Sequence, residues 1–184
     1  MHNCYVFIGP SGSGKTTIAA KAFLPEQKII THTSRSPRKN EQEGIDYFFV
    51  SKETFQEMIQ KDQLVEWDCY ADNYYGTSKA ELTEKLAEND CYAALTASGF
   101  WHFRKQYGAA IVPVFIQISE ETLEKRLEAR GETAATITKR VALFQNDQKQ
   151  LEKLRKIPEL ILLDNNGEFE ESVAAFKAAL QKKK

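Results

Sequence analysis

A glycine-rich stretch near the N-terminus, GPSGSGKTT at residues 9–17, is the strongest constraint on what this chain can fold into. It follows the apolar run CYVFIG at 4–9, which is typical of a strand buried in a parallel sheet. It leads into KTTIAAKAF at 15–23, which indicates a helix that ends before Pro25. A strand, a glycine loop and a helix in this order predict an α/β domain.

The loop fits the pattern GxxxxGK[ST] from Gly9 to Thr16 without a mismatch. Its glycines let the backbone fold around phosphates with its N–H groups inward, and the following helix adds its positive end. We expect Lys15 to reach the terminal phosphates and Thr16 to offer a hydroxyl to Mg²⁺. A chance glycine-rich turn is the alternative, but here the required strand and helix flank the loop. The predicted ATP-binding residues are Gly9, Pro10, Ser11, Gly12, Ser13, Gly14, Lys15, Thr16 and Thr17.

Strand and helix patterns alternate through most of the remaining chain. We predict further strands at 28–33, 91–97, 111–118 and 159–164, and helices at 79–89, 100–108 and 168–182. Two segments break this rhythm. Residues 32–77 are polar and strand-rich, with a helix from Ser51 to about Lys61 and a small antiparallel sheet at 63–78, whereas 120–150 are helical and broken at RGET.

We therefore predict one domain over 1–184, with a P-loop NTPase-like parallel sheet flanked by helices. Its core spans about 1–31, 78–119 and 151–184. An inserted mixed-β lobe spans about 32–77, and an inserted helical lobe spans about 120–150.

Composition excludes several other classes. The formal net charge of −1 gives no overall field for nucleic acid or a membrane surface, and no run approaches the length of a membrane span. Cys4, Cys69 and Cys91 form no CxxC pair, and the N-terminus lacks the pattern of a signal peptide. We expect a cytoplasmic protein whose partners are small molecules. Its oligomeric state stays open.

A second anion site is indicated in THTSRSPRKNEQEGIDYFFV, residues 31–50. Arg35 and Arg38 lie three apart among hydroxyl side chains, and planar guanidinium groups suit a phosphate dianion. A solvated charged loop is the usual fate of such a stretch. Beside an intact phosphate loop, however, a second anion site is what a kinase of phosphorylated acceptors needs.

With these residues in place, the sequence resembles the guanylate kinase family. The family pattern T-[ST]-R-x-x-[KR]-x-x-[DE]-x-x-G-x-x-Y-x-[FY] is met in full from Thr33 to Phe49, and the likeness covers roughly 4–165, including EKRLEARGE. It implies Mg²⁺-dependent, in-line phosphoryl transfer from ATP to GMP, giving GDP. It also implies that the lobe at about 32–77 binds the acceptor nucleotide and that the helical lobe at about 120–150 is a lid. The resemblance assigns the GMP phosphate to Thr31, Arg35, Arg38, Tyr47 and Tyr75, guanine to Glu66 and Thr77, and a catalytic role to Lys15 and the lid residues Arg126, Arg130 and Arg140.

The chemistry of the guanine pair also holds without the family. Guanine presents N1–H and a 2-amino group as adjacent donors, and one carboxylate accepts from both. Adenine lacks that donor pair, so it leaves Glu66 poorly paired. A surface acid on a strand is the alternative for Glu66. For Arg126 and Arg130, which are i, i+4 on one helix, the alternative is surface ion pairing with Glu124 and Glu128.

One family motif is absent. The family carries (E/D)-I-D-V-Q-G after its third core strand, where this chain has Ala94-Leu95-Thr96-Ala97-Ser98-Gly99 and neither acid. In the family these acids help to organise Mg²⁺ and hold the acceptor. Three hypotheses stay open: a GMP kinase, a related kinase with a different phosphorylated acceptor, and a non-catalytic binding module of the same fold.

Overall fold

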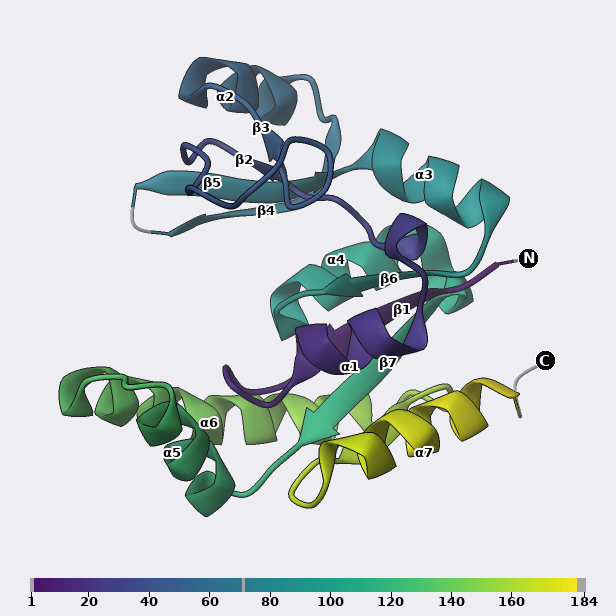
Figure 1. The fold of residues 1–184 in the computed structure, drawn as a ribbon. Coiled ribbons are helices and arrows are strands. Elements are labelled where there is room, and N and C mark those ends of the chain that lie inside the picture. The colour runs from purple at the N-terminus through teal and green to yellow at the C-terminus, as the bar shows by residue number, and fades with distance from the viewer. Residues whose placement is uncertain (1, 71, 182–184) are drawn as a thin grey trace.

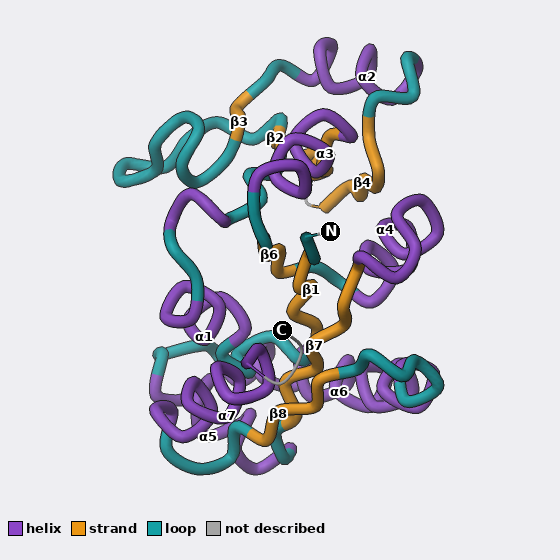
Figure 2. The backbone as a smooth tube through the Cα atoms, turned by 90° about the vertical axis from the view of Figure 1, so that its right-hand side faces the viewer, coloured by secondary structure: helices purple, strands orange, loops and turns teal. Residues whose placement is uncertain are grey.

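The computed structural model describes residues 2–70 and 72–181, and its centre is a four-stranded parallel sheet. The strand order is β6-β1-β7-β8 (Figure 2). Every residue of β1 is buried, as expected for a strand with helices on both faces. The strands are β1 (Cys4–Ile8), β6 (Cys91–Ala94), β7 (Ile111–Gln117) and β8 (Ile161–Asp164).

Helices cover both faces of this sheet, as Figure 2 shows. On one face, α1 and α7 bury Ile18 and Phe176 against the strands. On the other, α4 and the end of α6 bury Phe103 and Leu154. These layers confirm the predicted α/β class. The helices are α1 (Lys15–Ala22), α3 (Lys79–Glu88), α4 (Ala97–Tyr107), α5 (Glu120–Ala129), α6 (Ala134–Leu154) and α7 (Phe169–Gln181), with 3₁₀ turns at Pro25–Gln27 and Gly108–Ala110.

A second, mixed sheet lies above the first in Figure 1, with strand order β3-β2-β5-β4. Its strands are β2 (His32–Thr33), β3 (Phe48–Phe49), β4 (Leu64–Tyr70) and β5 (Asn73–Ser78). The antiparallel β4–β5 pair and the parallel β2–β3 pair make it the mixed sheet that the sequence predicts. Helix α2 (Lys52–Gln60) covers it, and Ser51 caps that helix by accepting from the Thr54 backbone N–H.

Two predicted strands are shorter than expected. The strand predicted at 28–33 is reduced to His32–Thr33, because Lys28 makes only an isolated bridge to Tyr92 before the chain crosses to the second sheet. The strand predicted at 91–97 ends at Ala94. The Thr96 hydroxyl accepts from the Gly99 N–H at 3.1 Å, so α4 begins at Ala97 rather than at the predicted residue 100.

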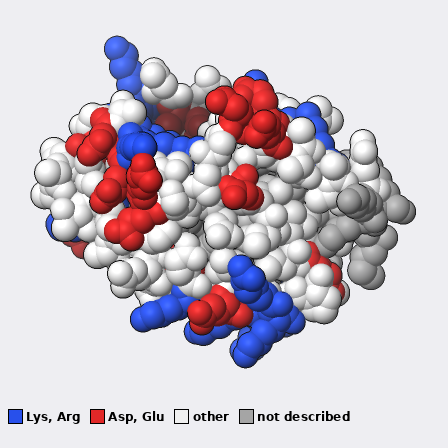
Figure 3. All heavy atoms as spheres, turned by 90° about the horizontal axis from the view of Figure 1, so that it is seen from below, with Lys and Arg blue, Asp and Glu red and all other residues white. Residues whose placement is uncertain are grey.

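The helical segment after β7 breaks where the sequence predicts. Gly131 has a φ of +72°, a left-handed conformation that suits glycine, and it separates α5 from α6. Thr133 then caps α6. Along the described chain, no helix is long and apolar enough to cross a bilayer. The underside of the molecule carries acidic and basic side chains close together rather than a field of one sign (Figure 3).

Candidate active site

The phosphate loop connects β1 to α1 and is held tightly by its surroundings. Gly9 has a φ of +143°, and a Cβ there would lie 2.6 Å from the carbonyl oxygen of Ile116. Gly14 has a φ of +94°, and a Cβ there would lie 2.8 Å from the amide nitrogen of Asn165. Only glycine satisfies both the backbone conformation and the close approach at these two positions.

Lys15 begins α1 with its side chain folded back over the loop. Its Nζ donates to the carbonyl oxygens of Gly9 and Pro10, each at 2.7 Å. Burial lowers the pKa of Lys15 to about 8, the charge of Asp147 opposes this shift, and Arg130 adds to it. The amine therefore lies among oxygen acceptors, in a place where a phosphate anion would stabilise its charge.

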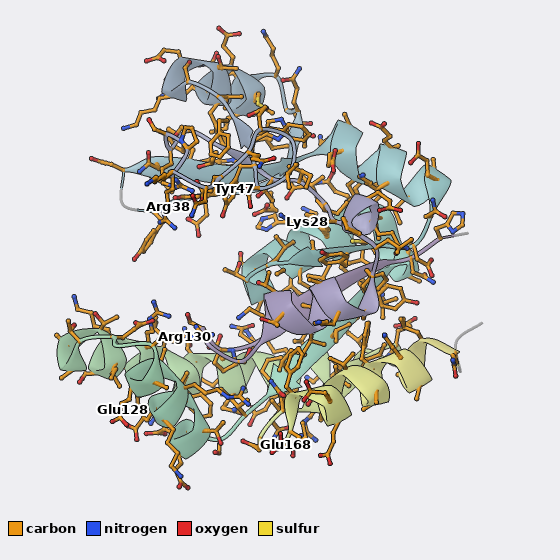
Figure 4. The ribbon with its side chains drawn as sticks, viewed as in Figure 1. Lys28, Arg38, Tyr47, Glu128, Arg130 and Glu168 are labelled. Carbon is orange, nitrogen blue, oxygen red and sulfur yellow. The ribbon has the colours of Figure 1, made fainter. Side chains whose placement is uncertain are left out.

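The three predicted lid arginines all reach the neighbourhood of the loop. Arg140 donates to the Ser11 hydroxyl and pairs with Glu132 at 3.0 Å. Arg130 lines a hollow with Gly12 and Thr16, and Figure 4 shows it projecting toward the loop side of α5. Arg126 donates to the backbone oxygen of Asn165 at 2.7 Å, and burial, followed by the nearby Arg130, lowers its pKa.

Asn165 is a supporting residue that the sequence reasoning missed. It follows β8, is 1% exposed, and its amide donates to the Ser13 backbone oxygen at 2.7 Å. Its own side-chain oxygen accepts from Ser172 at 2.8 Å. The only sequence signal was an asparagine at the end of a buried strand, which is too common to single out.

Beside the second sheet, Arg35, Tyr47 and Tyr75 of the predicted phosphate residues lie together, and Arg38 joins them through its backbone contact with Glu41. Arg35 pairs with Glu41 at 2.8 Å and lies over the Tyr47 ring, with its guanidinium carbon 5.6 Å from the ring centroid. The rings of Tyr47 and Tyr75 are 6.1 Å apart. Glu41 also accepts from the Arg38 backbone N–H at 2.8 Å. Figure 4 shows Arg38 and Tyr47 on the side of this lobe that faces the central sheet.

The predicted guanine residues lie opposite each other across the β4–β5 pair. Glu66 is in register with Thr77, whose buried hydroxyl donates to the carboxylate at 2.9 Å. Burial raises the pKa of Glu66, while the Thr77 hydrogen bond and the charge of His102 oppose the shift. The carboxylate is thus fixed by one neutral donor and has remaining lone pairs for a ligand.

Two hollows lie beside the phosphate loop at the edge of the central sheet. One of about 320 Å³ is lined by Thr16 of the loop together with Thr31 and Tyr47, two of the residues predicted to hold the acceptor phosphate. The other, of about 400 Å³, is lined by Lys15, Ala94, Thr96, Arg140 and Asp147 among others. Both volumes fall in the range of small-molecule sites. The end of β6, where the expected acids are replaced, lies between the two hollows and contributes Ala94 to each.

Comparisons with known proteins agree with this arrangement. The guanylate kinase family profile matches residues 1–183. The guanylate kinase of Fusobacterium nucleatum is 34% identical over 171 residues, which cover 91% of this chain and 90% of that protein. That of Mycoplasma genitalium is 32% identical over 184 residues, which cover 96% and 74%.

Solved structures give the same fold. A guanylate kinase from Anaplasma phagocytophilum matches with a TM-score of 0.67 and 20% identity, covering 99% of this chain and 86% of that one. A gluconokinase from Sinorhizobium meliloti matches with a TM-score of 0.53 and 20% identity, covering 98% and 92%. These two likenesses bear on the fold alone. From the family profile and the sequence relatives, this chain belongs to the guanylate kinase family of nucleoside monophosphate kinases.

Proposed function

We propose that this chain transfers the γ-phosphoryl group of ATP directly to the phosphate of GMP, yielding ADP and GDP. One observation carries the proposal: Thr16 of the phosphate loop shares a hollow with Thr31 and Tyr47 of the acceptor cluster. A donor phosphate at the loop and an acceptor phosphate at the cluster therefore meet in one space. In-line transfer needs this proximity and charge neutralisation more than it needs covalent chemistry by the protein.

On the donor side, the loop and Lys15 hold the phosphates of ATP. The Lys15 amine exchanges its two carbonyl acceptors for phosphate oxygens, which stabilise the charge that burial disfavours. Arg126, Arg130 and Arg140 approach from α5 and α6 and neutralise charge that develops on the moving group. Gly9 through Thr17 supply the remaining loop contacts.

On the acceptor side, Arg35, Arg38, Tyr47, Tyr75 and Thr31 hold the phosphate of GMP. In the free protein Glu41 accepts from Arg35, so the acceptor phosphate replaces a carboxylate as the partner of that guanidinium. Glu66 accepts from N1–H and the 2-amino group of guanine. Thr77 fixes the orientation of Glu66 and contacts the base edge.

The residues present fit a hydrated Mg²⁺ held mainly by the nucleotide. Thr16 offers a hydroxyl beside the loop, and oxygen donors are what Mg²⁺ prefers. Across the described chain, no group of three or more histidine, cysteine, aspartate or glutamate side chains is arranged as a metal cage. Mg²⁺ commonly keeps several waters and few protein ligands, so this agrees with the ion that MgATP brings. When bound, it neutralises charge on the transferring phosphates.

A coupled assay of ADP formation over GMP, dGMP, AMP, IMP, CMP and UMP tests the proposal. We expect GMP to give the highest kcat/KM and AMP to be strongly disfavoured. Higher kcat/KM with another acceptor would favour the related-kinase hypothesis that the loss of the acids at Ala94 and Thr96 raised. Absence of both turnover and calorimetric binding of ATP and GMP would favour a non-catalytic module.

A further inference from the structure

The cavity at the phosphate loop has two unlike walls. The β6 wall presents Ala94 and Thr96, which carry no charge. The α6 wall presents Arg140 and Asp147. These two residues are seven apart, about two helical turns, so they lie on the same face of α6. The acid absent from the strand end is therefore matched by one on the opposite wall.

The Asp147 carboxylate has no hydrogen-bond donor among the described residues. It is partly buried, yet within the described chain its carboxylate takes part in no hydrogen bond and no salt bridge. The other acid near Arg140, Glu132, is already paired with that arginine at 3.0 Å. A partly buried carboxylate without a hydrogen-bond donor is costly, which favours a donor that arrives with the ligand.

The electrostatics connect Asp147 to the phosphate end of the cavity. Burial raises the pKa of Asp147, and the charge of Lys15 opposes that shift. In return, Asp147 opposes the effect of burial on Lys15. The carboxylate therefore lies within electrostatic reach of the amine that we assign to the ATP phosphates.

We propose that Asp147 is a positioning residue for MgATP, and that it supplies from α6 the negative charge that the end of β6 lacks. Its carboxylate accepts hydrogen bonds from waters of the hydrated Mg²⁺ of MgATP. Contact through water suits an ion that keeps several waters and finds no cage of acidic side chains in the described residues. This inference rests on the ATP-binding half of the proposed function.

Calorimetric titration of ATP, without acceptor, tests the inference by a readout other than activity. ATP is titrated into the full chain in EDTA and at several Mg²⁺ concentrations. We expect Mg²⁺ to tighten ATP binding by the wild-type protein. Asp147→Asn should reduce this Mg²⁺-dependent increase in ATP affinity, called the gain below, roughly tenfold, because loss of outer-shell partners has effects of this size. Glu152→Gln, the same kind of change at an exposed position of α6, is the matched control and should keep the full gain.

A second variant tests whether a carboxylate on the β6 wall can replace that of Asp147 on the α6 wall. Thr96→Asp puts a carboxylate on the β6 wall, and α4 keeps its cap because aspartate caps helices as well as threonine does. In the Asp147→Asn background it should restore most of the Mg²⁺-dependent gain. If Asp147→Asn does not fold, as judged by thermal melting, Asp147→Ser takes its place in both backgrounds.

Three results overturn the inference: an unchanged gain in Asp147→Asn, an equal loss of ATP affinity with and without Mg²⁺, or no rescue by Thr96→Asp. The equal loss would mean that Asp147 only holds Lys15. Failure of the proposed function is seen separately. Wild type that shows the Mg²⁺ gain but no GMP-dependent ADP formation would refute GMP phosphorylation and leave the role of Asp147 standing.

Discussion

The donor and acceptor sides of the site are stabilised in different ways. On the donor side, the loop is held by backbone contacts and by buried Asn165, and Lys15 is bonded to two carbonyls of the loop. On the acceptor side, Arg35 is held by the side chain of Glu41 and by ring contacts on a small sheet. The comparison suggests a donor site that is formed before binding and an acceptor site that exchanges a carboxylate for its ligand.

The largest expected effect comes from removing the donor-side amine. Lys15→Met should lower kcat/KM by about 10³-fold, because the charge aimed at the transferring phosphates is lost. Steady-state kinetics with GMP and ATP measure this loss. Lys21→Met, the same substitution at an exposed position in the last turn of α1, should leave the rate nearly unchanged. Similar losses in both variants would contradict the assignment.

On the acceptor side, we expect a large effect on catalysis with GMP and none on ATP affinity. Arg38→Ala should lower kcat/KM for GMP by about 10²-fold, since one of two guanidinium groups assigned to the acceptor phosphate is removed. ATP affinity, measured by calorimetry without GMP, should stay the same. Lys39→Ala is the neighbouring control. A matching loss of ATP affinity would show that the two sides are not independent.

Glu66→Gln should reduce the preference for GMP over AMP by roughly 10- to 100-fold, because a charge-assisted acceptor is lost. The pH profile sharpens this prediction. Burial raises the pKa of Glu66, so wild-type kcat/KM for GMP should fall on acidification at a higher pH than an ordinary glutamate would give. The phosphate of GMP also titrates near pH 6, and Glu66→Gln retains only that part of the profile.

The raised pKa of Glu66 also makes the free energy of unfolding depend on pH, and in the direction opposite to kcat/KM: the stability falls as the pH rises. A carboxyl whose pKa is raised in the folded state contributes stability below its unfolded pKa and loses it as pH rises through the folded pKa. Without ligand, the stability of Glu66→Gln relative to wild type should therefore increase as the pH rises from about 4 through the folded-state pKa of Glu66. Denaturant unfolding at several pH values measures the difference. A constant difference would mean that burial does not disfavour the charge.

The smallest expected effect is on the support of the loop. Asn165→Ala leaves the Ser13 carbonyl and the Ser172 hydroxyl without this partner, which should cost about 1–3 kcal/mol in the free energy of unfolding. ATP should bind more weakly, while GMP binding is unchanged. Ser172→Ala is the control: it keeps the Asn165–Ser13 hydrogen bond and removes the contacts of the Ser172 hydroxyl with Asn165 and with the Asp164 carbonyl oxygen. Equal losses for both nucleotides would contradict a donor-side role.

Local patterns predicted much of this architecture. The loop, β1 and α1 could be predicted because one continuous segment forms them. The strand predicted at 28–33 was too long, since whether Lys28–Ile30 pairs depends on a strand sixty residues away. The start of α4 lies three residues before the predicted one, because Thr96 caps the helix while the apolar run of β6 continues in sequence to Ala97.

In the site, too, contacts between residues close in sequence could be predicted, and contacts between distant segments could not. Residues of contiguous motifs, such as Arg35 and Tyr47, came together as the sequence indicated. Asn165 could not be assigned, because its place beneath the phosphate loop comes from packing between elements that are distant in sequence. The spacing of seven between Arg140 and Asp147 predicts that they share a face of one helix, but that this face lines the cavity at the phosphate loop is seen only in the structure.

The central claim is that the two sides act together in one transfer despite the uncharged end of β6. The most direct measurement is the stoichiometry of nucleotides when purified protein is incubated with MgATP, with and without GMP. We expect ADP and GDP in equal amounts with GMP, and almost no ADP without it. ADP formed without GMP, or no GDP with it, would contradict the claim.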